Sequence, residues 1–125
     1  DEILKLKLNA DWVVLSACNT GASDGKGAEA VSGLGKAFFY AGTRALLVTM
    51  WSVETTSARK LVTGIFQAQE ENKALSRAQA LRKSMLNLID NETLKEETTG
   101  KIAASYAHPL FWAPFVIVGD PGKSL

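Results

Sequence analysis

The stretch that decides the fold is residues 12–50, WVVLSACNTGASDGKGAEAVSGLGKAFFYAGTRALLVTM, in which two apolar runs flank a glycine-rich loop and a helical pattern. Residues 12–15 and 45–50 are short runs of mainly apolar residues, which is the pattern of strands buried on both faces of a sheet. We therefore expect strands near residues 12–17 and 45–50.

A helix is predicted between these two strands, over residues 28–41. Val31, Leu34 and Phe38 recur at helical spacing, and Gly42 stands where a left-handed residue would end the helix. A strand, a helix and a strand at this length form a βαβ unit. The two strands are therefore expected to be parallel neighbours.

Two more helices are predicted after the second strand. One runs from about residue 53 to residue 70, and the other opens with the capping-box pattern of Ser76 to Gln79. The expected apolar face of the first consists of Ala58, Leu61, Ile65 and Ala68. The expected apolar face of the second consists of Ala78, Leu81, Met85 and Leu88.

The C-terminal part of the sequence is predicted to form a long loop and a final strand. Residues 91–107 are polar and without a clear period, so we expect a loop there. Residues 115–118 form an apolar run, and Pro114, which has no N–H to donate, indicates an edge position or a bulge. The predicted fold class is α/β, with helices on both faces of a mostly parallel sheet.

Composition limits the possible functions. The chain has 125 residues, of which 46% are hydrophobic and 22% charged, as in an ordinary globular domain or part of one. A net charge of +1 gives no bulk attraction for nucleic acid or an anionic membrane, so neither is expected as a partner. The single cysteine cannot form an intrachain disulfide, which favours a cytoplasmic location. Because the chain starts at Asp1 instead of methionine, we expect a fragment of a longer protein.

Cys18 is the leading candidate for a catalytic residue. It follows the first predicted strand at its carboxyl end, where α/β sheets hold ligands and catalytic groups. A free cysteine is also among the most buried residue types, so a packing role is the alternative. Its position before a glycine-rich loop favours a nucleophile. We expect Cys18 to be at least partly accessible, with a mobile loop after it.

The loop after Cys18 does not fit a phosphate-binding motif. A Walker loop needs four residues between its glycines, whereas three residues separate Gly21 from Gly25. Gly27 also stands where the magnesium-binding hydroxyl belongs. No residues have the spacing of metal ligands, and we predict no cofactor.

Several other notable residues have structural explanations. The only histidine, His108, is held extended by Pro109, and we predict that it packs near the last strand and does not partner Cys18. Glu29 and Glu54 fall in predicted first helical turns, where a carboxylate interacts favourably with the helix dipole. The tryptophans are expected in the core; they are Trp12, Trp51 and Trp112.

Three stretches together resemble the CHAT domain, a caspase-like module often found beside tetratricopeptide repeats. They are DWVVLSACNTG, GAEAVSGLGKAFFYAGTRALLVTMWSVE and HPLFWAPFVIVGD, and residues 2–12 resemble the family's lead-in to the cysteine strand. The resemblance implies a caspase-like three-layer sandwich. It also implies that residues 1–125 are the C-terminal part of a single such domain.

The resemblance carries functional residues onto this chain position by position. Cys18 matches the family nucleophile, and its backbone N–H would supply half of an oxyanion hole. Glu29 matches the acidic residue of the family's GEG segment. The segment that contains Trp51, Ser52 and Glu54 matches the family's WSVDD segment near the substrate pocket, with Glu-Thr in place of Asp-Asp. His108 matches the family's structural histidine.

One departure from the family pattern is large. The family's catalytic histidine lies in an HG motif upstream of the cysteine, and the residues before Cys18 contain no histidine. We therefore expect the nucleophile-bearing half of a cysteine endopeptidase, inactive alone. Its expected partners are a protein or peptide substrate, the upstream half of the domain and, in the parent, tetratricopeptide repeats. A non-catalytic interaction module is the main alternative, and an α/β small-molecule domain is a third.

Overall fold

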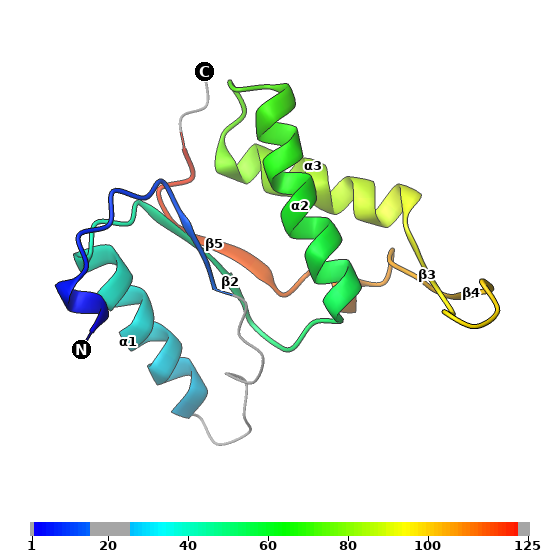
Figure 1. Ribbon diagram of the computed structural model, residues 1–125, viewed down its shortest axis with the longest axis horizontal. Helices are drawn as coiled ribbons and strands as arrows, with labels where there is room; N and C mark the ends of the chain where they lie inside the picture. The colour runs from blue at the N-terminus through cyan, green and yellow to red at the C-terminus, as the bar shows by residue number, and fades with distance from the viewer. Residues whose placement is uncertain (1, 16–25, 123–125) are drawn as a thin grey trace. The chain divides into compact units, whose positions relative to one another are not determined.

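The computed structural model describes residues 2–15 and 26–122, without the side chains of residues 26–32. The chain divides into two compact units, Asp1–Ser52 with Pro114–Pro121, and Val53–Ala113 with Gly122–Leu125. In the first unit the helix α1, Lys26–Tyr40, connects two strands of a sheet. In the second unit the helices α2, Thr55–Glu71, and α3, Arg77–Asn91, pack on each other and lead into a hairpin (Figure 1).

The sheet of the first unit has the order β1-β2-β5. Its strands are β1, Val13–Leu15, β2, Ala45–Thr49, and β5, Phe115–Gly119. β1 pairs with β2 in parallel and β5 pairs with β2 antiparallel, so the predicted parallel neighbours and the edge position of the last strand are confirmed. The expectation of a mostly parallel sheet is wrong for the described strands, which form a mixed sheet.

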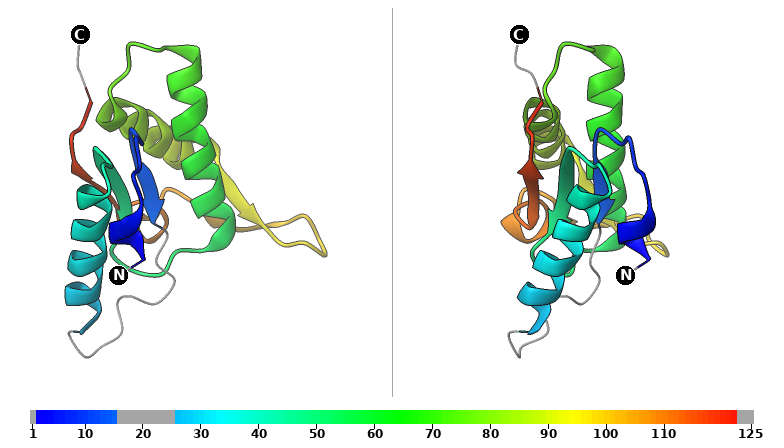
Figure 2. Two further views of the ribbon diagram at one scale, coloured as in Figure 1. Left: turned by 60° about the vertical axis from the view of Figure 1, so that its left-hand side comes forward. Right: turned by 90° about the vertical axis from the view of Figure 1, so that its left-hand side faces the viewer.

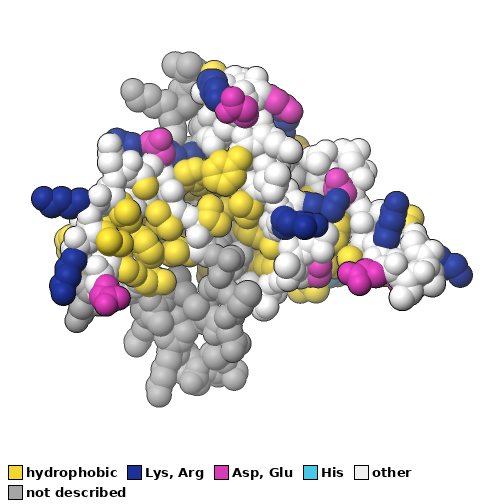
Figure 3. All heavy atoms as spheres, viewed as in Figure 1, with side chains coloured by type: hydrophobic (Ala, Val, Ile, Leu, Met, Phe, Trp, Pro, Cys, Tyr) yellow, Lys and Arg dark blue, Asp and Glu magenta, His cyan; other side chains and the backbone are white. Residues whose placement is uncertain are grey.

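The middle strand forms the core of this unit. All five residues of β2 are buried, as expected for a strand covered on both faces. The three residues of β1 are only half-buried, because β1 is an edge strand of the described sheet. Hydrophobic side chains gather on the face of the molecule around α1 and β1 in Figure 3.

The turn from α1 into β2 requires glycine at position 42. Gly42 has a φ of 100°, and its N–H donates to the Phe39 carbonyl at 3.0 Å, which confirms the predicted left-handed cap. A Cβ on Gly42 would lie 2.2 Å from the Leu8 carbonyl oxygen. The N-terminal segment crosses this turn closely and donates from Leu8 N–H to the Ala41 carbonyl at 2.5 Å.

The two helices of the second unit pack through faces that the sequence predicts only in part. The buried residues of α2 are Ser57, Leu61, Ile65 and Ala68, and those of α3 are Ala80, Leu81, Ser84 and Leu88. Ala58 and Met85 are half-buried and Ala78 is exposed, so the predicted face of α3 is wrong at its first position. The capping box of Ser76 and Gln79 is confirmed.

Small residues allow α2 and α3 to approach each other. Ser84 Oγ donates to the Leu61 carbonyl at 2.6 Å, and a Cβ on Gly64 would lie 2.4 Å from that Oγ. A prediction based on the spacing of apolar residues does not place a serine on the buried face of a helix. The hydroxyl is nevertheless accommodated there, because it has a hydrogen-bond acceptor.

Residues 91–107 contain a hairpin in place of the predicted long loop. The strands β3, Thr93–Lys95, and β4, Ile102–Ser105, pair antiparallel and extend away from the C-terminal end of α3 (Figures 1 and 2). Glu96 N–H donates to the Lys101 carbonyl at 2.9 Å, and Gly100 has a φ of 67°. The strands are short and none of their residues is buried, so they lack the apolar alternation by which a strand is recognised.

None of the helices in the described parts of the chain combines the length and the apolar character needed to cross a membrane.

The Gly64–Ser84 approach gives a test of the α2–α3 packing. We expect Gly64→Ala to lower the free energy of unfolding by roughly 1–3 kcal/mol, because the new methyl group overlaps Ser84 Oγ. Gly33→Ala in α1 is the matched control, since a Cβ there meets nothing within 4 Å, and we expect it to stabilise by about 0.5–1 kcal/mol. Urea denaturation measures both variants. Equal effects at the two positions would contradict the close packing.

Candidate functional site

The carboxyl ends of β1 and β2 lie at one edge of the sheet. The strands are parallel and in register, with Leu15 opposite Val48. The chain therefore leaves β1 toward Cys18 and leaves β2 toward Trp51 at the same edge, which is where α/β sheets hold ligands. Cys18 lies outside the described residues, so its predicted accessibility and the predicted loop mobility stay predictions.

Other predicted site residues differ in how they are placed. Glu29 lies on the first turn of α1, as predicted, and its side chain is outside the description. Trp51 and Ser52 follow β2 and are exposed, Trp51 by 40%. The core prediction for Trp51 is therefore wrong, while Trp12 and Trp112 are half-buried. The sequence alone does not distinguish an exposed tryptophan that follows a strand from a tryptophan that packs in the core.

Glu54 is the N-cap residue of α2. Its Oε1 accepts a hydrogen bond from Thr56 N–H and its Oε2 accepts one from Ser57 N–H, both at 2.7 Å. The predicted interaction with the helix N-terminus is thus made through direct capping, one residue before the first turn. Desolvation by burial raises the pKa of Glu54. The hydrogen bonds from Thr56 and Ser57 outweigh that effect and hold the pKa below its usual value of 4.5.

Tyr106 is a partner of Glu54 that sequence reasoning missed. Its side chain is fully buried, and its hydroxyl donates to Glu54 Oε2 at 3.3 Å. Its ring meets Phe111 edge-on, with 4.9 Å between the centroids and 77° between the planes. Burial, together with the charge and hydrogen bond of Glu54 and the charge of Glu92, raises the pKa of Tyr106 to about 12. No local pattern links residues 52 positions apart, so the sequence held no signal for this pair.

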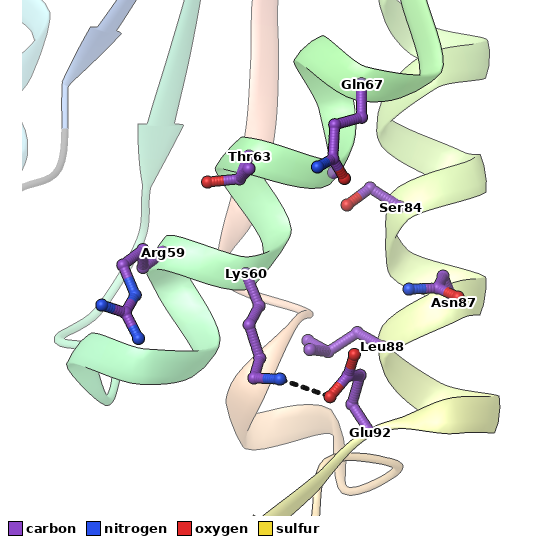
Figure 4. A pocket seen from close by; sticks show the side chains of 9 residues that line it. Arg59, Lys60, Thr63, Gln67, Ser84, Asn87, Leu88 and Glu92 are labelled. Carbon is purple, nitrogen blue, oxygen red and sulfur yellow. Dashed lines mark hydrogen bonds and ion pairs between the residues drawn. The ribbon is translucent and has the colours of Figure 1, made fainter. Parts of the chain in front are cut away.

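Open cavities lie beside these residues within the second unit. One of about 530 Å³ is lined by Glu54, Thr56, Lys60, Tyr106, residues 91–95 and Glu97. Another, of about 280 Å³, lies between α2 and α3 (Figure 4). An ion pair between Lys60 and Glu92 borders both of them.

His108 makes a structural hydrogen bond, as predicted. Its Nδ1 accepts from Leu110 N–H at 3.2 Å and caps the short helix η2, Pro109–Phe111. The ring is exposed. Within the parts of the chain that the structure describes, no group of three His, Cys, Asp or Glu side chains is arranged to hold a metal ion.

The Glu54–Tyr106 bond can be tested by titration. Tyr40→Phe leaves Tyr106 as the only tyrosine of this chain, and we expect its phenol to titrate near pH 12 in ultraviolet difference absorbance. We expect Glu54→Gln to lower that midpoint, because it removes the carboxylate that disfavours the phenolate. A midpoint near 10, the value of a free phenol, or no change with Glu54→Gln would contradict the pairing.

Comparison with known proteins gives one family. The model of the CHAT domain matches residues 1–120, which is nearly the whole chain. No curated protein and no solved structure matches it. The match includes both strands of the parallel pair and the C-terminal segment that carries Tyr106 and His108. The chain therefore belongs to the CHAT domain family, which is related to the caspase-like peptidases.

Proposed function

We propose that this chain is the nucleophile-bearing half of a caspase-like cysteine endopeptidase that hydrolyses peptide bonds in protein substrates. The observation that carries the proposal is the family match over residues 1–120 together with the sequence position of Cys18. Cys18 follows β1 by three residues in the sequence, and β1 ends at the edge where the carboxyl ends of two parallel strands meet. A nucleophile in that position can meet a substrate outside the sheet.

In the proposed reaction, the Cys18 thiolate attacks the scissile carbonyl carbon. The bond that forms is the carbon–sulfur bond of a tetrahedral intermediate, whose oxyanion accepts a hydrogen bond from the Cys18 backbone N–H. The carbon–nitrogen bond then breaks, an imidazolium protonates the leaving amine, and a thioester remains. Water, deprotonated by the same imidazole, hydrolyses the thioester and restores the thiol. The reaction needs no cofactor.

The imidazole in this proposal comes from a segment of the protein upstream of these residues. His108 is the only histidine here, and its Nδ1 already accepts a backbone hydrogen bond that caps η2. The upstream half would complete a single caspase-like domain, a three-layer sandwich of which residues 1–125 are the C-terminal part. Tetratricopeptide repeats in the parent and a cytoplasmic location belong to the same proposal.

The remaining candidate residues receive roles in substrate binding. Trp51 and Ser52 follow β2, and both are exposed. β2 ends at the same edge of the sheet as β1, the strand that Cys18 follows in the sequence. An exposed indole suits packing against an extended peptide. Glu29 is proposed as an acidic contact to the substrate, on its resemblance to the family's GEG segment.

A cleavage experiment tests the proposal. We expect the full-length protein to cleave members of a broad peptide library, and Cys18→Ala and residues 1–125 alone to cleave none of them. Loss of the general base alone lowers a rate by roughly a hundred- to ten-thousandfold. Cys18→Ser, which keeps size and polarity, controls for folding.

The outcomes separate the two candidate functions. Cleavage that survives Cys18→Ala would remove the nucleophile and with it the peptidase. Binding of peptides by the full-length protein without any cleavage would favour the non-catalytic interaction module.

A further inference from the structure

The carboxylate of Glu54 is engaged by its own protein. Oε1 accepts from Thr56 N–H, and Oε2 accepts from both Ser57 N–H and the Tyr106 hydroxyl. The main chain of Glu54 is held as well, because its carbonyl accepts from Ser57 Oγ at 2.9 Å and from Ala58 N–H at 3.0 Å. This residue joins the start of α2 to the segment after β4.

These bonds argue against Glu54 as a reader of a basic substrate side chain. A carboxylate oxygen has two lone pairs, and both lone pairs of Oε2 have donors in this structure. A guanidinium that binds a carboxylate bidentately must donate to both oxygens. A substrate arginine would therefore have to displace either the helix cap or the bond from a fully buried tyrosine.

Tyr106 is held in place by contacts other than the one with Glu54. Its ring is 0% exposed and packs edge-on against Phe111, and its N–H donates to the Glu92 carbonyl at 3.4 Å. Loss of the acceptor for a buried hydroxyl is costly, so the phenol favours the arrangement in which Glu54 stays at the cap. Tyr106 thus holds Glu54 in place by a contact that leaves the cap bonds intact.

We infer that Glu54 and Tyr106 are positioning residues, a clamp that fixes the backbone at the start of α2, directly after Trp51–Val53 in the sequence, and that neither recognises a substrate charge. Only Val53 separates Glu54 from Ser52, so the extended backbone at Glu54, with φ −60° and ψ 134°, sets the direction of the chain entering α2. The expected effect of this clamp on peptide cleavage rests on the proposed function, because that function assigns Trp51 and Ser52 to substrate binding.

The decisive variant is Tyr106→Phe in the full-length protein. It keeps the ring packing and the cap and removes the hydroxyl bond to Glu54. We expect amide hydrogen exchange over residues 51–57 to rise by roughly tenfold, because one hydrogen bond to a charged group is lost. Tyr40→Phe makes the same chemical change at a residue that is 83% exposed, and we expect it to leave that exchange unchanged.

Peptide cleavage gives the second readout, at a temperature where every variant is folded. We expect Tyr106→Phe to raise KM roughly tenfold for basic and neutral substrates alike, with a smaller change in kcat, because Trp51 and Ser52, less ordered at the start of α2, bind the peptide more weakly. We expect Glu54→Gln to leave the ratio of basic to neutral cleavage within about twofold. Glu70→Gln, an exposed residue of α2, is its matched control.

Each outcome bears on the inference. Unchanged exchange over residues 51–57 in Tyr106→Phe would overturn the clamp. A selective loss of basic substrates in Glu54→Gln, by tenfold or more, would make Glu54 a reader of charge and overturn the positioning role. If the wild-type protein cleaves nothing, the proposed peptidase fails, and the exchange measurement still decides whether the clamp orders the segment.

Discussion

Parallel pairing of β1 with β2 is the constraint on which the first unit depends. Two parallel strands cannot be joined by a tight turn, so the chain must cross back over the sheet, and α1 provides that crossover. The crossover returns through Gly42, whose left-handed backbone and close approach to Leu8 leave no room for a side chain. Because the two strands are parallel, the chain leaves both of them at the same edge of the sheet. The segment that leads to Cys18 and the segment that leads to Trp51 therefore begin at that edge.

In the second unit, polar contacts set where both helices begin and add a hydrogen bond where the helices meet. Glu54 begins α2, Ser76 and Gln79 begin α3, and Ser84 bonds to the Leu61 carbonyl where the helices meet. Each of these groups satisfies a donor or acceptor that burial would otherwise leave unpaired. These bonds determine where the two helices begin and how they contact each other. The Glu54–Tyr106 hydrogen bond also ties the start of α2 to the segment that follows β4.

Sequence reasoning recovered what local patterns and chain topology encode. The βαβ unit, the glycine cap, the capping box and the edge strand each have a short-range physical cause, and the structure confirms them. The hairpin of residues 93–105 was missed because its short strands bury little, and Ser84 was missed because a buried hydroxyl has no apolar signal. Of the site, Glu54 at a helix start was predictable, whereas its bond to Tyr106 joins distant segments and needs the fold.

We propose that Cys18 and the residues that follow β2 meet at one edge of the sheet. A disulfide measures this directly, since it forms only between cysteines whose Cα atoms come within about 7 Å. Ser52→Cys places a second thiol after β2, and Tyr40→Cys places one at the end of α1, which precedes the opposite end of β2. Under mild oxidation, with the linked peptides identified by mass spectrometry, we expect a Cys18 disulfide with position 52 and none with position 40. A disulfide with position 40 and none with position 52 would contradict it.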